Sequence, residues 1–240
     1  MSNAKKKIKD YLSLSMRKLK HRKGYGVHSP FAYSIITEVI EEKLPYYAYH
    51  RMARTYGKDA PISMKVACLM LRLANRFRCR NVAELSCNGG YTILPLVLTD
   101  SRLRVSSLAT PDMHEATQLR LMWLTSRMQQ VNWVEEIDAL SSAAPYDMIV
   151  INDNPFLPVA GKPTPEQLQT AGQQLADWVM THSQPDTLIF VKGIQPRHRQ
   201  ELFWDQICDR EDVSITMDLY DYGLAILKPH FFKQHYIVAF

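Results

Sequence analysis

The sequence lacks the features that mark several protein classes. Its four cysteines are scattered and form no C-x-x-C pair, so the pattern predicts neither a zinc site nor a disulfide framework. No apolar run approaches the roughly 18 residues that a membrane-spanning helix requires. The start of the chain also lacks the apolar stretch of a secretory signal. We therefore expect a cytoplasmic protein without a membrane span.

Acidic residues are scarce in one part of the chain only. Residues 1–24 hold nine lysines and arginines against the single acid Asp10, whereas the remaining chain has a slight excess of acid. The positive charge thus belongs to a basic tail, which could contact nucleic acid, anionic lipid or an acidic partner. The apolar period of residues 5–22 allows an amphipathic helix, and docking of this helix on its own domain is the simpler interpretation.

The first 60 residues form a predicted basic and helical extension. Ser29 followed by Pro30 indicates a helix N-cap with proline at the first helical position, and the helix should reach Ile40. The aromatic segment 45–56 could cover a site as a lid or form the face of a homodimer. A further helix is expected over residues 62–77.

Residues 61–240 change to an alternation of strands and helices. Short apolar strands are expected at 82–85, 104–108, 133–137, 147–151 and 187–191, with helices at 91–98, 112–129, from 164 onwards and at 197–208. The last forty residues predict three strands with no helix between them, at 213–219, 223–227 and 235–240. This pattern predicts an α/β, Rossmann-like three-layer sandwich whose mostly parallel sheet is closed by antiparallel strands.

The segment from Glu84 to Tyr91 has the composition of a ligand-binding loop. A strand ends in an acid and is followed by a glycine-containing turn and a helix, and such turns let the backbone approach a ligand at a helix N-terminus. The sequence Glu-Leu-Ser-Cys-Asn-Gly-Gly-Tyr is not G-x-G-x-x-G, so it does not predict a dinucleotide site.

Residues 82–92 resemble the first motif of class I S-adenosylmethionine-dependent methyltransferases. Over about residues 20–240 the chain is similar to a bacterial O-methyltransferase-like group of catechol type, through three local matches: residues 26–31 (GVHSPF), 146–151 (YDMIVI) and 233–238 (KQHYIV). The resemblance implies S-adenosylmethionine as the cofactor. Its implied contacts lie at Glu84, Ser86, Asn88, Gly89, Gly90, Tyr91, Asp112, Asp138 and Asn152.

Several positions depart from the motifs of that family. Ser86 stands where the first glycine is usual, and its Cβ should exclude conformations that only glycine adopts easily. Ala109 stands at the end of the second strand, where the family has an acid for the ribose. Asp112 could reach back to the ribose, although capping of the next helix is the more natural role. Asp138 fits the neighbourhood of the adenine, and a solvated turn residue is the alternative.

The metal-dependent members hold Mg²⁺ through carboxylates after the fourth and fifth strands. Here Asn152 replaces the first carboxylate and Lys192 stands in the second position, where a cation would repel Mg²⁺. Lys192 could pair with Asp153 and fill the metal site with an internal ion pair. We therefore expect no metal.

Three functions remain open from the sequence. The first is a metal-independent methyltransferase acting on a small molecule, with His28 and Lys192 as candidates for a base. The second is a catalytically degenerate protein of the same fold that serves as a binding or partner module. The third is an RNA-binding or RNA-modifying protein that uses the basic tail.

Overall fold

The computed structural model describes residues 15, 17, 20, 24, 26–122, 126–158, 161–195 and 200–240. Among these residues, eight strands form one sheet: β1 (Asn81–Leu85), β2 (Arg104–Leu108), β3 (Val131–Val134), β4 (Tyr146–Ile151), β5 (Ser183–Lys192), β6 (Ile215–Asp218), β7 (Tyr222–Ile226) and β8 (Gln234–Ile237). The α-helices are α2 (Pro30–Ile35), α3 (Tyr47–Met52), α4 (Met64–Arg76), α5 (Ile93–Thr99), α6 (Pro111–Leu121), α7 (Ile137–Leu140), α8 (Pro165–Thr181) and α9 (Glu201–Asp209).

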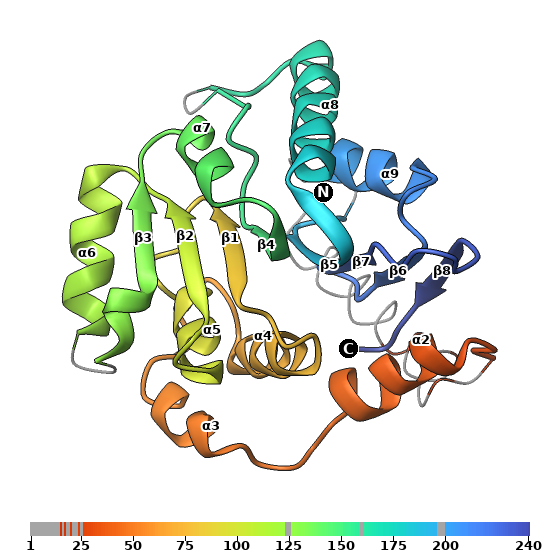
Figure 1. Cartoon of the computed structure of the whole chain (residues 1–240), viewed down its shortest axis with the longest axis horizontal. Helices are drawn as coiled ribbons and strands as arrows, with labels where there is room; N and C mark the ends of the chain where they lie inside the picture. Colours follow the sequence, from red (N-terminus) through yellow and green to blue (C-terminus); the bar gives the residue numbers. More distant parts are fainter. Residues whose placement is uncertain are drawn as a thin grey trace.

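The sheet has the order β3-β2-β1-β4-β5-β7-β6-β8. Strands β1 to β5 are parallel, β7 is antiparallel to β5 and β6, and β8 runs parallel to β6. This arrangement confirms the predicted parallel sheet with antiparallel closure (Figure 1). The chain moves outward from β1 to β3 and then returns to β4 on the other side of β1. Such a reversal places a crevice at the carboxyl ends of β1 and β4, where open α/β sheets bind ligands.

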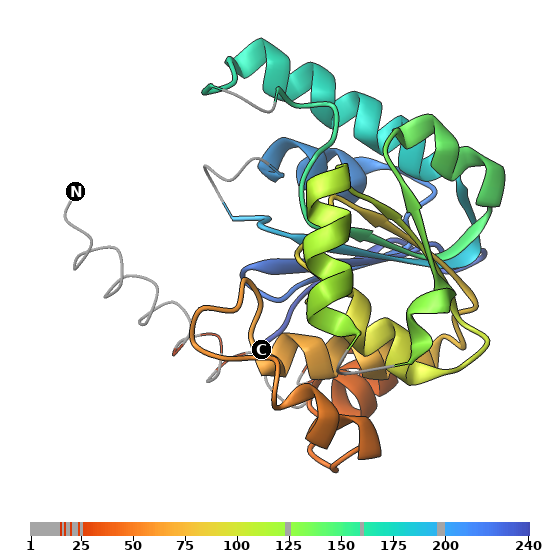
Figure 2. The same cartoon turned by 90° about the vertical axis from the view of Figure 1, so that its left-hand side faces the viewer.

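Two hydrophobic cores lie on opposite faces of the sheet, as expected of a three-layer sandwich. Buried residues of α2, α4 and α5 belong to one core, and those of α8 and α9 belong to the other. Figure 2 shows the sheet nearly edge-on between these two layers. Because Ala32 and Ile35 of α2 are fully buried in the first core, this helix of the extension packs as part of the layer.

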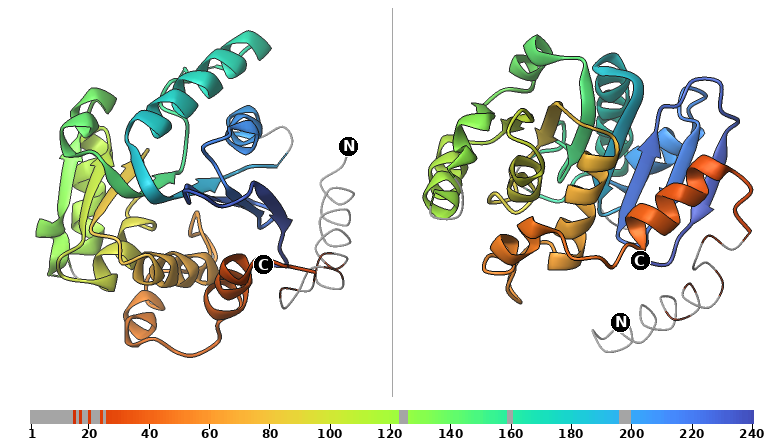
Figure 3. Two further views of the ribbon diagram at one scale, coloured as in Figure 1. Left: turned by 45° about the vertical axis from the view of Figure 1, so that its right-hand side comes forward. Right: turned by 60° about the horizontal axis from the view of Figure 1, so that its bottom comes forward.

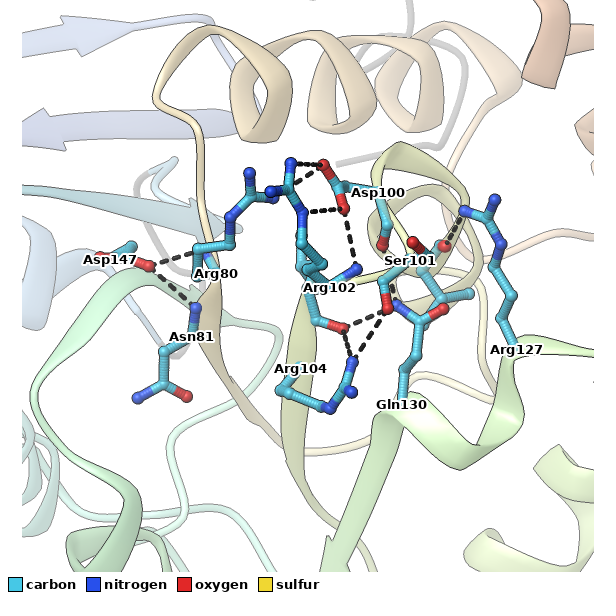
Figure 4. Close-up of polar contacts among 11 residues, drawn as sticks. Arg80, Asn81, Asp100, Ser101, Arg102, Arg104, Arg127, Gln130 and Asp147 are labelled. Carbon is cyan, nitrogen blue, oxygen red and sulfur yellow. Dashed lines mark hydrogen bonds and ion pairs between the residues drawn. The ribbon is translucent and has the colours of Figure 1, made fainter.

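The amino ends of the strands are held together by polar contacts (Figure 4). The Asp147 carboxylate on β4 accepts hydrogen bonds from the backbone N–H groups of Arg80 and Asn81, at 2.6 and 2.8 Å. Arg80 also forms an ion pair with Asp100 at 2.8 Å. Gln130 donates to the carbonyl oxygens of Asp100 and Leu103, which joins β3 to the turn before β2. These contacts leave the opposite, carboxyl edge for ligands.

Several sequence predictions about elements need correction. The last strand, expected at 235–240, is β8 and ends at Ile237. The helix expected over 112–129 is α6, which ends at Leu121, and the 3₁₀ helix η2 (Arg127–Gln130) precedes β3. The third strand lies at 131–134 and not at 133–137. The helix that begins at Pro30 changes into the π-helix η1 (Ile36–Ile40), and a second 3₁₀ helix, η3, covers Ser141–Ala143. The Ser29 cap itself is confirmed, because its side chain accepts the N–H of Ala32.

The basic tail lies mostly outside the described residues. This applies to the predicted helix over 5–22, of which the structure describes residues 15, 17 and 20. The Arg17 guanidinium donates to both carboxylate oxygens of Asp218, at 2.8 and 2.9 Å. It also lies over the ring of Tyr220, 5.1 Å from its centre. Arg17 thus attaches this part of the chain to the end of β6. Within the described residues, no helix is long and apolar enough to cross a membrane.

Candidate functional site

The residues that follow β1, β4 and β5 lie in a row at the carboxyl edge of the sheet. Leu85, Ile151 and Val191 are aligned across the three strands. The next residues are Ser86, Asn152 and Lys192, and neighbouring strands are about 4.8 Å apart. The strand alignment therefore brings three of the candidate residues to the point where the strand order reverses.

The loop after β1 is held in a left-handed conformation at three positions. The φ angles of Ser86, Gly89 and Gly90 are +67°, +57° and +81°. Backbone bonds fix the loop to its neighbours, because Cys87 donates its N–H to the Leu108 carbonyl oxygen at 2.8 Å. The expectation that Ser86 excludes a glycine-like conformation is thus wrong: the serine adopts this conformation, at a cost of about 1–2 kcal/mol for a residue with a Cβ.

Gly90 allows a close approach of α6. A Cβ at this position would lie 2.7 Å from Leu121 Cδ1 and 2.8 Å from Thr117 Cγ2. At Gly89, in contrast, the nearest atoms belong to the Tyr91 ring, 3.7 Å away. The side of Gly90 to which a Cβ would project is therefore filled by α6, whereas Gly89 has more space around it.

Glu84 lies at the centre of a buried hydrogen-bond network. Its side chain is fully buried, and Ser107 donates to Oε2 at 2.5 Å while Thr92 donates to Oε1. The amide Nδ2 of Asn152 also donates to Oε1, at 3.1 Å. Burial raises the pKa of Glu84 to about 7, although the three hydrogen bonds oppose this shift. Both carboxylate oxygens thus have protein partners.

Three buried polar atoms near this loop have no hydrogen-bond partner among the described residues. They are Asn152 Oδ1, Asn88 Nδ2 and Thr55 Oγ1. Asn152 Oδ1 is an acceptor and Asn88 Nδ2 is a donor, so the loop offers both kinds of group to a ligand. Buried polar atoms normally have partners, and their absence here fits a ligand with an ammonium and a carboxylate group, as in the methionyl part of S-adenosylmethionine.

A second pair of such atoms lies between α6 and β3. The rings of His114 and Trp133 are stacked with their centres 4.6 Å apart. His114 Nε2 and Trp133 Nε1 are both buried and without a partner within the described part of the chain. These residues are close to the ends of β2 and β3.

The tyrosines around the loop come from two parts of the chain. Tyr91 accepts a hydrogen bond from Arg120 through its hydroxyl, and the Arg120 guanidinium lies 4.8 Å from its ring centre. Tyr56, from the connection between α3 and α4, donates to the Tyr91 carbonyl oxygen at 2.5 Å. The aromatic segment 45–56 therefore contacts the loop at its end, and its role as lid or dimer face stays a prediction.

The two candidate aspartates lie on the surface. Asp112 is exposed in the first turn of α6, whose N-cap is Thr110. The prediction that Asp112 caps this helix is wrong, because the Thr110 hydroxyl accepts the Met113 N–H. Asp138 is exposed in the first turn of α7. The expected end of the second strand is correct, since Ala109 follows β2 and is buried.

Lys192 ends β5 beside Asn152. Burial lowers the pKa of Lys192, and the negative charge of Asp153 partly opposes this shift. Asp153 also accepts a hydrogen bond from Gln200 at 3.3 Å. The pairing of the two side chains stays a prediction. In the described ranges, no group of three or more His, Cys, Asp or Glu side chains is placed to hold a metal ion.

His28 lies far from the loop. It is exposed beside Ser29, and the backbone of Ser29 interacts with the Tyr236 hydroxyl on β8. Figure 3 shows α2 against the strands at this end of the sheet. Strand β8 is five positions from β1, which corresponds to roughly 24 Å at the usual strand spacing. This position does not support His28 as a base at the cofactor loop.

Sequence reasoning did not identify Thr92, Ser107 or Tyr56 as parts of the site. Thr92 follows the loop directly and could have been noticed as a hydroxyl at a helix start. Ser107 is one residue before the end of β2, and its alignment with Glu84 becomes visible only when the two strands are paired. The sequence carries no signal that Tyr56 reaches Tyr91.

Neither a protein-family model nor a curated protein sequence matches this chain. Several solved structures match it in fold. The O-methyltransferase TomG from Streptomyces achromogenes, in complex with S-adenosylmethionine, shares 19% identity over 77% of this chain and 91% of its own, with a TM-score of 0.54. An O-methyltransferase from Bacillus cereus, in complex with S-adenosylhomocysteine, shares 16% identity over 81% of this chain and 97% of its own, with a TM-score of 0.56.

A fungal protein matches over a similar length. The methyltransferase PaMTH1 from Podospora anserina, bound to S-adenosylhomocysteine, shares 13% identity over 82% of this chain and 95% of its own, with a TM-score of 0.57. These similarities extend over nearly the whole length of each solved chain. The chain therefore has the fold of the S-adenosylmethionine-dependent methyltransferases.

Proposed function

We propose that this protein is an S-adenosylmethionine-dependent methyltransferase that methylates an oxygen of a small molecule without a metal ion. The observation that carries the proposal is a set of buried polar groups at the carboxyl edge of β1 and β4 that have no partner among the described residues. In a fold shared with O-methyltransferases that bind this cofactor, Asn152 Oδ1 and Asn88 Nδ2 are an acceptor and a donor at the motif loop.

The residues of the chain would act mainly by binding and orientation. When bound, the cofactor supplies an electrophilic methyl group on its sulfonium. Asn152 would accept the ammonium of the amino-acid part, and Asn88 and Thr55 would donate to its carboxylate. Transfer of a methyl group requires alignment of the acceptor oxygen with the methyl and the sulfur, so positioning supplies much of the rate acceleration. The ammonium of Lys192 stands where a metal ligand would be, which fits a metal-independent reaction.

Thermal unfolding in the presence of S-adenosylmethionine and S-adenosylhomocysteine tests the proposal. A ligand that binds only the folded state at 100 times its Kd adds about 2.7 kcal/mol to the free energy of unfolding. For a chain of this size, such a gain raises Tm by roughly 5–10 °C. Adenosine and methionine at equal concentration serve as controls. If millimolar cofactor changes neither Tm nor the heat measured by titration calorimetry, the proposed function is wrong.

A binding module of the same fold is the second candidate. The departures at Ser86, Ala109, Asn152 and Lys192 favour it. A methyltransferase turns the cofactor over in the presence of an acceptor, whereas a binding module would bind it without turnover. Release of S-adenosylhomocysteine during incubation with a panel of phenols and hydroxy acids separates the two.

A further inference from the structure

We infer that Glu84 acts on the cofactor through Asn152: the carboxylate holds the Asn152 amide in the orientation that directs Oδ1 toward the cofactor ammonium. Glu84 is then a positioning residue and not a direct ligand. The inference rests on the proposed function, because it describes how the same site recognises the amino-acid part of its cofactor.

The first step is that the Glu84 carboxylate is buried behind its hydrogen-bond donors. Its side chain is fully buried, Ser107 occupies Oε2, and Thr92 and Asn152 occupy Oε1. Because the side chain is fully buried, direct binding of an ammonium would require the residues around the carboxylate to move. A ligand would therefore contact a residue that surrounds Glu84 in the hydrogen-bond network, and not Glu84 itself.

The second step is that Asn152 is the residue of this network that a ligand would contact. Its Nδ2 faces three acceptors: Glu84 Oε1 at 3.1 Å, the Ser86 carbonyl oxygen at 3.0 Å and Thr92 Oγ1 at 3.0 Å. A flipped amide would place Oδ1 against the carboxylate and the carbonyl oxygen, which is repulsive. The acceptors thus fix the amide with Oδ1 on the other side.

The third step concerns what Oδ1 does. It is buried and has no partner among the residues that the structure describes, although its own Nδ2 is engaged three times. An unpaired buried acceptor costs free energy, and a bound ammonium would remove this cost. The carboxylate behind the amide adds charge attraction to the same ammonium.

Protonation of Glu84 should disturb this arrangement. A protonated carboxyl group no longer places a negative charge behind the amide, and a proton on Oε1 can be donated to Asn152 only if the amide turns and Oδ1 leaves the ligand side. Cofactor binding thus favours ionised Glu84, and it should release a proton over the pH range where the apo protein still holds one. Burial raises the pKa of Glu84 to about 7, so affinity should rise from pH 5.5 to pH 7.5 and then level off.

The cysteines and the tyrosine closest to Glu84 do not share this window. Cys87 in the loop, Tyr56 before α4 and Cys68 in α4 all have pKa values raised by burial, so they stay neutral below pH 8. From α6, His114 stacks on Trp133, and comparison of the unaltered protein with Glu84→Gln separates the effect of Glu84 from that of any other group. Ser107 of β2 and Asn152 after β4 do not titrate.

Titration calorimetry of the full chain with S-adenosylhomocysteine tests the inference. In the unaltered protein at pH 6.5, heats measured in buffers of different ionisation enthalpy should reveal release of roughly half a proton or more. The Kd should fall at least fivefold between pH 5.5 and 7.5. Glu84→Gln should weaken binding about tenfold at pH 7.5 and abolish most of the pH dependence, whereas the matched control Glu38→Gln, at an exposed position of η1, should change neither.

Two further variants keep the outcomes separate. Asn152→Ala should weaken binding and reduce proton release, since the link between Glu84 and ligand is lost. Ser107→Ala should leave the amide orientation in place and weaken binding less than Asn152→Ala. If S-adenosylhomocysteine binds the unaltered protein with the same Kd at all pH values and without proton release, the inference is overturned while the proposed function stands. If it does not bind at any pH, the proposed function itself fails.

Discussion

At the scale of single residues, Ser86 gives the clearest prediction. Its φ of +67° is unfavourable for a residue with a Cβ, whereas glycine adopts it freely. Ser86→Gly should therefore increase the free energy of unfolding by about 1 kcal/mol, after allowance for the greater freedom of glycine in the unfolded chain. Chemical denaturation measures this change. A destabilised Ser86→Gly variant would show that the serine side chain makes a contribution larger than its backbone strain.

Substitution of Gly90 should lower the free energy of unfolding, in contrast to the substitution of Ser86. A methyl group at this position meets Leu121 and Thr117 of α6 at less than 3 Å, and φ is +81°. Gly90→Ala should cost roughly 2–4 kcal/mol through the combination of overpacking and backbone strain. Gly89→Ala is the matched control: it has a similar φ but no contact below 3.7 Å, so its cost should be smaller. Equal losses for the two variants would contradict the packing role.

Glu84 predicts a pH dependence of stability in the absence of cofactor. Its pKa is about 7 in the folded protein and about 4.5 in the unfolded chain, so the unfolded state loses its proton first as pH rises. The contribution of this group to the free energy of unfolding is fully present below pH 4.5. It falls by about 3 kcal/mol between pH 4.5 and pH 7 and is constant at higher pH. The difference between unaltered protein and Glu84→Gln, measured by denaturation at pH 5 and pH 8, isolates this contribution. A pH-independent difference would contradict the raised pKa.

Individual residues also show where sequence reasoning succeeds. The Ser29 cap, the Glu84 loop and the strand at 104–108 follow from local rules, because a cap and a buried strand depend on adjacent residues. The network around Glu84 does not, because Ser107 and Asn152 are 23 and 68 positions away and meet Glu84 only through strand pairing. The prediction for Ser86 failed for a different reason, because the surrounding structure holds this residue in a backbone conformation that its Cβ disfavours.

At the scale of elements, Asp147 connects β4 to the start of β1. Its carboxylate accepts two backbone N–H groups and the Gln184 amide at 2.6 Å. Asp147→Ala leaves these donors without their charged acceptor, and it should cost about 2–3 kcal/mol. Asp59→Ala, at an exposed position, provides the control in the same denaturation experiment. A loss of less than about 0.5 kcal/mol would show that water replaces the carboxylate.

Helix α6 illustrates why element boundaries were harder to predict than element types. Its sequence mixes apolar and polar residues on all sides, and Leu119 and Met122 are exposed while Thr117 is fully buried. The spacing of the apolar residues therefore did not predict that the helix ends at Leu121. The end is set by packing, because Leu121 and Thr117 lie against Gly90 of the loop. A tertiary contact of this kind is not visible in the local pattern.

At the scale of the whole molecule, the fold brings the ends of β1, β4 and β5 together and so determines how the site treats metal ions. Magnesium binds carboxylate and other oxygen ligands, and here the two aligned positions are an amide and an ammonium. We expect that neither millimolar MgCl₂ nor EDTA changes the Kd of S-adenosylhomocysteine or the rate of any methyl transfer. A rate that falls in EDTA and recovers with Mg²⁺ would contradict the interpretation of Lys192.

Restoring the carboxylates tests the same argument in the other direction. Asn152→Asp combined with Lys192→Asp places two carboxylates on neighbouring strand ends, beside Asp153, and removes the opposing ammonium. This double variant should acquire Mg²⁺ binding in the millimolar range, detectable by calorimetry, because charge and ligand type then suit a hard cation. Lys192→Met removes the positive charge without adding a ligand and should not bind Mg²⁺. Since Asn152→Asp also removes the donor to Glu84, cofactor affinity should fall in the double variant even where Mg²⁺ binds, so that the two functions of this strand end separate.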